Sequence, residues 1–372
     1  MAQATTPVLQ TPSHAPRGIA ACLAAFAILF GLDALLFRTS LYPSILEPGS
    51  SAGQFELTFR RELRAQALNK DNLIVTLGNS RFAYLPRLAN ELTSQSGYVF
   101  RSAGSAGSDP RSWYYMLRDL DPAANRYRAV VFGVDDYDDE DTYEDHDDDI
   151  RALHYAIARL RLIDVVDFAA SFPSWAHRWE AFRGGLFKGF VLQRDIQAFL
   201  SHPKKRLEDV EINDRGFEDW TYNYNEDPRS LAGLRIDFAS WKVDFPAGAD
   251  QIQRDTVNAT LMRPAAPQTG RFANFQRRWF GRMLDRYRGS RTKIVFVRLP
   301  RGPVVRPDTL APRKSASIRE LARRPNVALC DEHAFDSLER PELFKDAVHL
   351  NREGCARFSA MLVAEVSRVL RR

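Results

Sequence analysis

Cysteine is scarce in this chain of 372 residues, which contains only Cys22, Cys330 and Cys355. Three cysteines cannot build the disulfide framework of a small secreted domain, and none belongs to a C-x-x-C pair typical of a zinc or redox site. A disulfide between Cys330 and Cys355 is left open, because it depends on a distance that the sequence does not give. Cysteine chemistry is therefore not expected to carry the function.

An excess of charge of one sign is also lacking. The chain has 52 Lys and Arg against 47 Asp and Glu, a net charge of +5, and the basic residues are spread along it. The densest basic stretch, residues 277–293, alternates with apolar residues as in an amphipathic helix with a solvated face. Nucleic acid is therefore not an expected partner.

Familiar patterns for metals and phosphates are missing as well. The acidic run 135–149 includes His146, but it lacks the ligand spacing and the glycine of an EF-hand. Neither a phosphate-binding Gly-x-x-x-x-Gly-Lys loop nor a dinucleotide-binding glycine fingerprint occurs. We expect the acidic run to be a solvated loop, and we expect neither a metal site nor a cofactor.

One long apolar run is present, at residues 18–37, and it is long enough to cross a bilayer as a helix. No small-x-small cleavage site follows it, so an uncleaved anchor is favoured over a signal peptide or a buried helix. Arg17 favours a cytoplasmic leader, residues 1–17, with the large domain outside. Asp33 within the run suggests a contact with another membrane protein.

The remaining chain alternates short apolar runs with longer helical stretches, which predicts an α/β fold with a parallel sheet covered by helices. After a linker and a helix at residues 38–70, one domain is expected at 71–372, with an insertion at 136–290. The insertion contains helical stretches near 150–170 and 187–200. It leaves the carboxyl end of a strand, where a lid or an acceptor-binding wall would lie.

Five strands and a last helix account for the rest of that domain. Each strand is a nearly continuous apolar run, as expected when both faces are buried. The expected strands are residues 72–78, 98–102, 128–134, 293–299 and 326–330, and the last helix is 352–370.

A serine stands where the first strand is predicted to turn into a helix. Residues 77–81 read Leu-Gly-Asn-Ser-Arg, which places Ser80 directly after the strand. Free backbone N–H groups at a helix start stabilise the oxyanion that forms when a serine attacks an ester. Ser80 is therefore a candidate nucleophile, and an ordinary helix N-cap is the alternative.

Asp346 and His349 form an Asp-x-x-His segment just before the last helix. An Asp at this spacing can turn back to the imidazole, fix its tautomer and stabilise the imidazolium that forms when a serine loses its proton. A structural histidine is the alternative for His349 alone. With Ser80, the segment predicts a triad of nucleophile, base and orienting carboxylate.

These two segments resemble the first and last sequence blocks of the SGNH (GDSL-like) hydrolase superfamily. The resemblance covers roughly residues 70–135 and 290–372, and it implies a three-layer α/β/α sandwich with a mainly parallel, flavodoxin-like sheet of five strands. An α/β-hydrolase shares the order Ser, Asp, His, but its nucleophile elbow needs a glycine two residues after the serine, where this chain has Phe82.

The resemblance also implies an oxyanion hole. The family uses the N–H of the serine, here Ser80, with a glycine after the second strand and an asparagine after the third. Gly107 matches that glycine best, with Gly104 as the alternative, and Asp135 stands in place of the asparagine. Because a carboxylate would repel an oxyanion, Asp135 is protonated, faces elsewhere, or is replaced by another donor.

Arg81, beside the nucleophile, is a candidate for binding an anionic group of the substrate, with a surface helix residue as the alternative. Aromatic residues of the insertion either stack on sugar rings or, as the favoured interpretation, belong to the core. They are Trp220, Tyr222, Tyr224 and Trp241.

With the anchor, the resemblance implies a single-pass protein of the bacterial inner (plasma) membrane with a periplasmic catalytic domain. Such proteins add or remove O-acyl groups, here expected to be acetyl, on envelope or secreted polysaccharides. A multi-span membrane O-acyltransferase is an implied partner. The alternatives are a non-catalytic scaffold or binding subunit of an acyltransferase complex, and a plain esterase or lipase.

Overall fold

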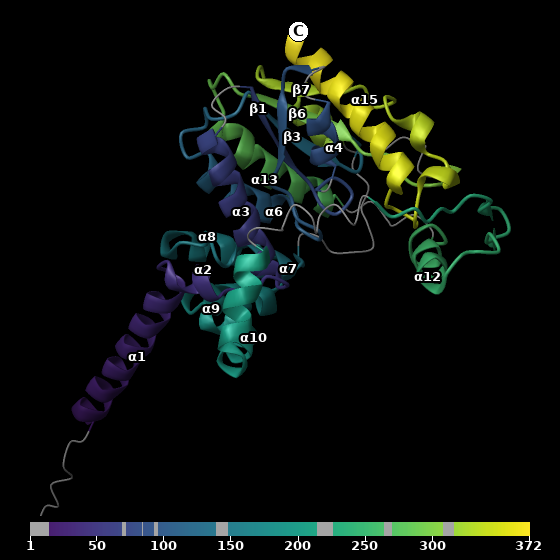
Figure 1. The fold of residues 1–372 in the computed structure, drawn as a ribbon. Coiled ribbons are helices and arrows are strands. Elements are labelled where there is room, and N and C mark those ends of the chain that lie inside the picture. Colours follow the sequence, from purple (N-terminus) through teal and green to yellow (C-terminus); the bar gives the residue numbers. More distant parts are fainter. Residues whose placement is uncertain are drawn as a thin grey trace, which may run out of the picture.

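A computed structural model describes residues 15–68, 72–83, 85–92, 96–138, 148–213, 226–263, 270–307 and 316–372. Five strands form one parallel sheet in the order β2-β1-β3-β6-β7 (Figure 1). Their bounds are β1 Leu73–Leu77, β2 Val99–Ser102, β3 Ala129–Val134, β6 Lys293–Arg298 and β7 Val327–Leu329. The predicted strands are confirmed, with every boundary within one residue of its expected position.

The central strands are buried on both faces, which is why they are continuous apolar runs. Every residue of β1 and of β3 is buried. Val75, Val130 and Ile294 lie level across three neighbouring strands and belong to one core, whereas Ile74 and Val131 face the other. The alternation of side chains along a strand therefore fills two separate hydrophobic cores.

Helices cover both faces of the sheet (Figure 1). The core that contains Ile74 and Val131 is covered by α4 (Pro86–Glu91) and α15 (Arg352–Arg371), which confirms the predicted last helix. The other core is covered by α3 (Ser51–Leu68), α6 (Pro110–Leu120), α13 (Arg271–Arg286) and α14 (Ser317–Leu321). The basic stretch that begins at residue 277 lies largely on α13, whose apolar side chains are buried.

Strand order fixes where a ligand would bind. From β1 the chain goes to β2 on one side, and it then returns to β3 on the other side of β1. A crevice forms outside the carboxyl ends of parallel strands at such a reversal. The residues that follow β1 and β3 are therefore brought to the same place.

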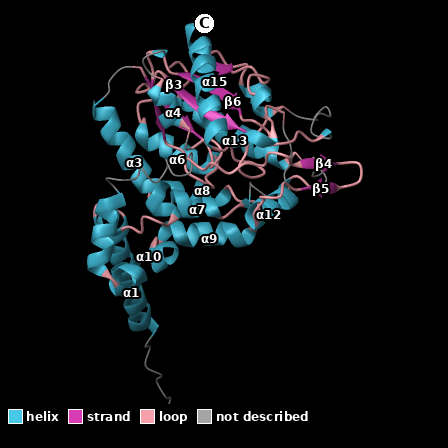
Figure 2. Ribbon diagram, turned by 45° about the vertical axis from the view of Figure 1, so that its right-hand side comes forward, coloured by secondary structure: helices cyan, strands magenta, loops and turns pink. Residues whose placement is uncertain are grey.

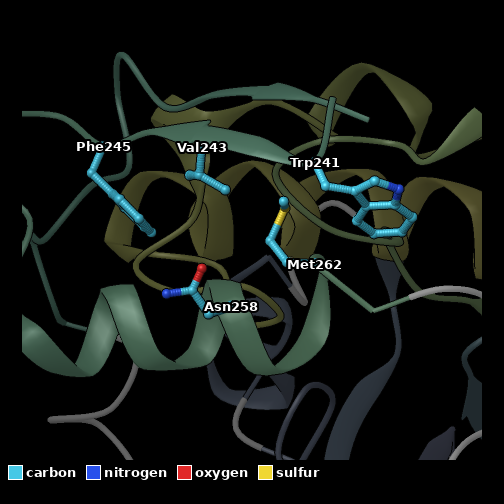
Figure 3. A pocket seen from close by; sticks show the side chains of 5 residues that line it. All are labelled: Trp241, Val243, Phe245, Asn258 and Met262. Atoms are coloured by element: carbon cyan, nitrogen blue, oxygen red, sulfur yellow. The ribbon is translucent and has the colours of Figure 1, made fainter. Parts of the chain in front are cut away.

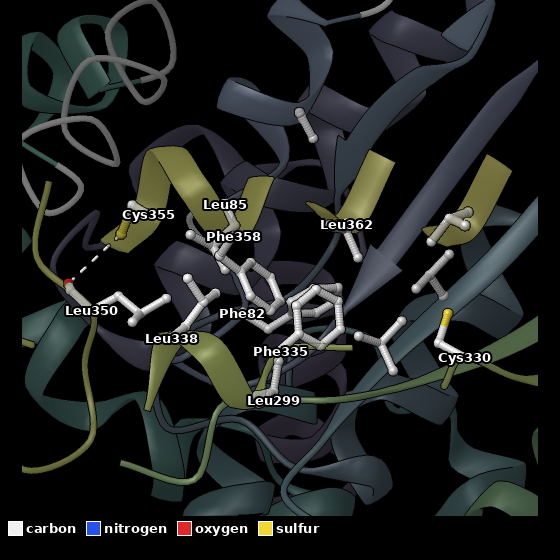
Figure 4. Close-up of a cluster of buried hydrophobic side chains, with 14 of the residues drawn as sticks. Phe82, Leu85, Leu299, Cys330, Phe335, Leu338, Leu350, Cys355, Phe358 and Leu362 are labelled. Atoms are coloured by element: carbon white, nitrogen blue, oxygen red, sulfur yellow. Dashed lines mark hydrogen bonds between the residues drawn. The ribbon is translucent and has the colours of Figure 1, made fainter. Parts of the chain in front are cut away.

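Cys330 and Cys355 are both buried, and they are not joined by a disulfide. They lie at opposite ends of the core that contains Phe82 and Phe358 (Figure 4). The Cys355 thiol donates to the carbonyl oxygen of Leu350 over 3.6 Å. The disulfide that the sequence left open is therefore not formed.

The insertion after β3 contains more helices than predicted. The expected helix at 150–170 is two helices, α7 (Arg151–Ala156) and α8 (Val165–Ala170), because a 3₁₀ turn at Leu162–Asp164 separates them. Asp164 breaks the run by accepting the N–H of Arg161 at 2.8 Å. The remaining elements are α9 (Trp175–Leu186), which was not predicted, α10 (Gly189–Ser201), β4 (Arg235–Asp237), β5 (Lys242–Asp244) and α12 (Gln251–Thr260).

Helix α1 (Ala15–Phe37) projects from the body of the protein (Figure 1). Its segment Gly18–Phe37 is, among the described residues, the one helical segment long and apolar enough to cross a membrane, with a mean hydropathy of 2.4. Its side chains are exposed except near the carboxyl end, where Phe37 is buried against the protein.

Asp33 of α1, for which the sequence suggested a contact with another membrane protein, has two partners within the same chain. Its carboxylate accepts the N–H of Lys188 at 3.1 Å and of Gly189 at 2.8 Å. These N–H groups begin α10, so Asp33 caps a helix that is more than 150 residues away in the sequence. The cap joins the end of α1 to the insertion.

The segment after α1 is packed against the insertion. Leu46 is fully buried, and the hydroxyl of Tyr42, in α2 (Leu41–Ile45), donates to Asp195 at 2.7 Å. Arg38 donates to the carbonyl oxygens of Gly185 at 2.7 Å and Leu186 at 3.0 Å. The part of residues 38–70 that was expected to be a linker is therefore a joint packed against the insertion.

Replacing Asp33 by Ala should destabilise this joint. Two N–H groups at the start of α10 lose their acceptor, and a lost helix cap costs about 1 kcal/mol, or roughly 2 °C in melting temperature for a domain of this size. Thermal unfolding of the full-length protein in detergent measures the change. Asp33→Asn keeps one acceptor oxygen and should lose less, whereas equal melting of Asp33→Ala and wild type would show that the cap contributes nothing.

Candidate active site

Ser80 lies in a single helical turn that starts where β1 ends. Asn79 holds this turn, because its side-chain oxygen accepts the N–H of Arg81 at 3.0 Å and its carbonyl accepts that of Ala83 at 2.8 Å. Asn79 is therefore the capping residue, and the interpretation of Ser80 as an N-cap is wrong. The Ser80 side chain is partly exposed and available for another partner.

The side chain of Phe82 packs in the core directly under the turn that carries Ser80. Its ring is fully buried and meets Phe358 edge-on, with ring centroids 6.3 Å apart (Figure 4). A Cβ atom at Gly78 would lie 2.6 Å from Phe82, and one at Gly133 would lie 2.5 Å from its ring. The glycines at the ends of β1 and β3 therefore leave the space that Phe82 needs.

A second turn presents the histidine. The carboxylate of Asp346 accepts the N–H groups of Val348 at 2.9 Å and His349 at 2.8 Å, and Lys345 donates its N–H to the carbonyl of His349 at 3.0 Å. Aspartate favours such local turns, because its short side chain reaches backbone N–H groups two and three residues ahead. The Asp-x-x-His segment thus forms a local turn that brings the Asp346 carboxylate to His349.

The two turns meet, as the sequence predicted. His349 Nδ1 lies 2.8 Å from Asp346 Oδ2, and His349 Nε2 lies 2.9 Å from the hydroxyl oxygen of Ser80. With Nδ1–H donating to the carboxylate, Nε2 is left as the acceptor for the serine hydroxyl. This arrangement can transfer a proton from Ser80 to His349 and make the serine a nucleophile.

Asp346 is held in its ionised form. Burial alone would raise the pKa of this carboxyl, but the hydrogen bond and charge of His349, with the N–H donors of Val348 and His349, outweigh burial and lower it. A lowered pKa contributes stability above the ordinary pKa of Asp, and this stability is lost as the pH falls through the lowered value. At neutral pH the carboxylate is thus present to stabilise an imidazolium.

Backbone N–H groups near Ser80 form a candidate oxyanion hole. In the part of the chain that the structure describes, no acceptor receives the N–H of Ser80 or of Gly107. Gly107 has φ +73°, and a Cβ there would lie 3.0 Å from the hydroxyl oxygen of Tyr155. That hydroxyl donates to the carbonyl of Ala106 and so holds the loop.

Gly104, the alternative glycine, has a packing role. A Cβ there would lie 2.4 Å from the carbonyl oxygen of Gly78, so only glycine lets the loop approach the end of β1. Its N–H also has no acceptor within the described residues. Gly104 therefore brings the loop to the site, and Gly107 sits at its left-handed bend.

Asp135 is not the side-chain donor that the family pattern places after the third strand. Its carboxylate accepts from Arg81, whose guanidinium also donates to the carbonyl of Pro300. Of the options left open by the sequence, Asp135 thus faces a neighbouring cation. Arg81 therefore places its positive charge against Asp135, next to Ser80, and a second N–H group of its guanidinium is engaged by Pro300.

Several supporting residues were not predicted. Asn351 caps α15 by accepting the N–H of Gly354 at 3.0 Å, and Gln253 of α12 donates to the carbonyl of Lys345 at 2.7 Å. The Asn351 cap is detectable, because an Asn before a periodic apolar stretch is a helix-start signal. The Gln253 contact is not, since it joins residues 92 positions apart.

The β4–β5 hairpin and α12 form an arm (Figure 2). Gln253 of α12 contacts the candidate catalytic loop, residues 344–350, which carries Asp346 and His349. An open pocket in this arm is lined by Trp241, Val243, Phe245, Asn258 and Met262 (Figure 3). Trp241 is 45% exposed, so its interpretation as a core residue is wrong. Trp220, Tyr222 and Tyr224 lie outside the described residues.

Within the described ranges, no group of three or more His, Cys, Asp or Glu residues is placed to hold a metal ion. Most of the acidic run, residues 139–147 with His146, lies outside those ranges. Compared with models of known families and with curated proteins, the chain has no match. The chemistry of the site therefore rests on its own geometry.

Replacing Gly133 by Ala should displace Phe82 and thereby the turn that carries Ser80. The added Cβ would overlap the ring of Phe82, and overpacking of this kind costs about 1–3 kcal/mol. Because Phe82 is two residues from Ser80, reactivity of the serine should fall as well. Urea unfolding and the rate of labelling by a fluorophosphonate measure the two effects.

Gly281→Ala is the matched control. A Cβ at this position of α13 meets nothing within 4 Å, and a helix gains up to about 1 kcal/mol from the exchange. Equal stability of Gly133→Ala and Gly281→Ala would contradict the role assigned to Phe82.

Proposed function

We propose that the protein is a serine-dependent O-acyltransferase or O-acyl ester hydrolase, anchored by α1 in the inner (plasma) membrane with its catalytic domain in the periplasm. The observation that carries the chemistry is the Ser80–His349–Asp346 arrangement, with 2.9 Å from the serine to the imidazole and 2.8 Å from the imidazole to the carboxylate. The proposal includes the assignment of the fold to the SGNH type, with a three-layer α/β/α sandwich.

In the first half-reaction His349 Nε2 takes the proton of Ser80 as the hydroxyl oxygen bonds to the acyl carbonyl carbon. The carbonyl oxygen becomes an oxyanion, and the N–H groups of Ser80 and Gly107 stabilise it. The imidazolium is paired with Asp346 and then gives its proton to the leaving oxygen. The products are an acyl-serine and an alcohol.

In the second half-reaction an acceptor hydroxyl replaces the leaving group. His349 takes its proton, the acceptor oxygen attacks the acyl-serine, and the proton returns to Ser80 as the ester bond to the enzyme breaks. Water as acceptor gives hydrolysis, and a sugar hydroxyl gives transfer. Exclusion of water at the site decides between them.

A polysaccharide is the proposed substrate, by resemblance to membrane-anchored bacterial proteins that modify envelope glycans, with acetyl as the acyl group. The exposed indole of Trp241 in the arm supports this, because a half-exposed aromatic ring beside an open pocket is suited to stacking on a sugar. Gln253 connects the arm to the catalytic loop. A multi-span O-acyltransferase is the proposed partner.

Ser80→Ala should abolish labelling of the full-length protein by a fluorophosphonate probe, since the reacting oxygen is removed. His349→Ala and Asp346→Asn should lower the labelling rate, and triad substitutions of this kind cost about 10³-fold or more in catalysis. In-gel fluorescence over time measures the rate.

Ser240→Ala is the control, because this serine lies on the exposed β4–β5 turn and its hydroxyl donates to the carboxylate of Asp237. A folded wild-type protein that does not react at all would favour the scaffold alternative. Acyl content of the cell's glycans, compared between wild type and Ser80→Ala, tests the physiological substrate.

Asp135→Asn should raise the rate of aryl acetate hydrolysis. The substitution removes a negative charge near the forming oxyanion and adds an amide donor, and a gain of ~1.4 kcal/mol corresponds to about 10-fold. Asp135→Ala removes the charge without adding the donor and should give a smaller gain. If both variants lose activity, the ion pair with Arg81 is needed to position the nucleophile.

A further inference from the structure

The turn between α9 and α10 lies beside the middle of α1. The ring of Phe187 meets Phe26 and Phe30 edge-on, with centroid distances of 5.3 Å and 5.7 Å. Since a helix rises 1.5 Å per residue, Phe26 stands about 16 Å along α1 from Phe37. The turn therefore lies against α1 at Phe26 and Phe30, closer to its amino end than Phe37, where the chain joins the domain.

The apolar run of α1 cannot be shifted to avoid this overlap. Gly18–Phe37 has 20 residues, and about 20 are needed to cross a hydrocarbon layer of ~30 Å. Arg17 precedes the run, and residues 9–14 upstream read Leu-Gln-Thr-Pro-Ser-His. If this run spans the membrane, the ring of Phe187 lies inside the hydrocarbon layer.

The composition and internal hydrogen bonds of the turn suit a hydrocarbon environment. Residues 184–192 read Gly-Gly-Leu-Phe-Lys-Gly-Phe-Val-Leu and contain one charged residue, Lys188. Lys188 is only 2% exposed, and its ammonium donates to the carbonyl of Ala158 at 3.0 Å. Asp33 accepts the N–H groups of Lys188 and Gly189, so the ammonium and these backbone groups have partners within the protein.

Apolar side chains continue from the turn over neighbouring helices. Trp175 and Trp179 are four residues apart on α9, hence on one helix face, and are 78% and 54% exposed. These helices lie at the end of the molecule from which α1 departs (Figures 1 and 2). Further large exposed apolar residues on these helices and the 3₁₀ turn before α8 are Leu162, Ile163, Val166, Phe190 and Leu200.

The charge of this region suits a membrane surface. Residues 161–207 contain eight Lys and Arg against four Asp and Glu, and six of the eight basic residues are exposed, namely Arg161, Arg178, Arg183, Arg194, Lys204 and Lys205. Of the four acids, Asp164 is paired with Arg118, Asp167 with Arg282, and Asp195 with the hydroxyl of Tyr42. Exposed basic residues with interleaved tryptophans are typical of a surface that meets anionic headgroups.

We propose that the α9–α10 turn enters the outer half of the bilayer beside α1, and that the apolar face of α8 and α9 rests on the same membrane. This proposal rests on the anchoring part of the proposed function, and it assigns lipid as the partner of this face. Because the joint after α1 is packed against the insertion, these contacts would set the height and orientation of the catalytic domain above the membrane.

Fluorescence quenching in vesicles of phosphatidylcholine and phosphatidylglycerol tests the proposal, with part of the acyl chains brominated. A bimane label is placed at Phe190→Cys or at Trp175→Cys in the full-length chain carrying Cys22→Ser. Cys330 and Cys355 are buried and do not react. The control label, at Ala360→Cys, sits on the exposed side of α15.

Cys22, labelled in the otherwise native chain, reports insertion of α1 separately. We expect loss of fluorescence at Cys22 and at position 190, loss at position 175 with bromines near the headgroups, and none at position 360. Quenching at Cys22 without quenching at positions 190 and 175 would overturn the inference and leave the anchor intact. If the labels at 190 and 175 were then shielded only in native membranes, a protein rather than lipid would cover this face. Absence of quenching at Cys22 would remove the anchor and the inference with it.

Discussion

The contact on which the site depends joins two residues 269 positions apart, the imidazole of His349 and the hydroxyl of Ser80, over 2.9 Å. Each partner is presented by a turn with its own internal hydrogen bonds, one held by Asn79 and the other by Asp346. Neither turn touches the other through its backbone hydrogen bonds, so the sheet and α15 must set the distance between them. Phe82, wedged between two strand-end glycines and Phe358, is the packing contact that does so.

Two carboxylates stand near the nucleophile with different partners. Asp346 is paired with the base, and the pKa of its carboxyl is lowered despite burial. Asp135 forms an ion pair with Arg81, whose positive charge lies against its carboxylate. The difference matters, because a carboxylate that orients an imidazolium assists acyl transfer, whereas an unpaired one would oppose the oxyanion. Stabilisation of the oxyanion is then left to backbone N–H groups.

The sheet was predictable because burial on both faces makes each strand a continuous apolar run, and the triad was predictable because Asp346 and His349 form a local turn. Features that depend on long-range pairing were not. Asp33 and Gly189 are 156 positions apart, and Arg81 and Asp135 are 54 apart, so no periodicity or spacing connects them. Helix α9 was missed because its glycines weaken the helical pattern, although packing against Val165 and Val191 requires them.

The insertion after β3, which the sequence suggested as a lid or wall, divides into parts with separate tasks. Its first part, residues 148–213, packs against α1 and α3, and Asp33 of α1 caps the start of its helix α10. Its second part, residues 226–263, packs against the catalytic loop, where Leu231 donates its N–H to the carbonyl of Phe344 at 2.9 Å. One continuous segment therefore contacts both the helix proposed to enter the membrane and the loop that carries His349. Within the described residues, the core of the sheet and this insertion both connect α1 to the loop that carries His349, so the packing of the α1 joint bears on the proposed chemistry of Ser80.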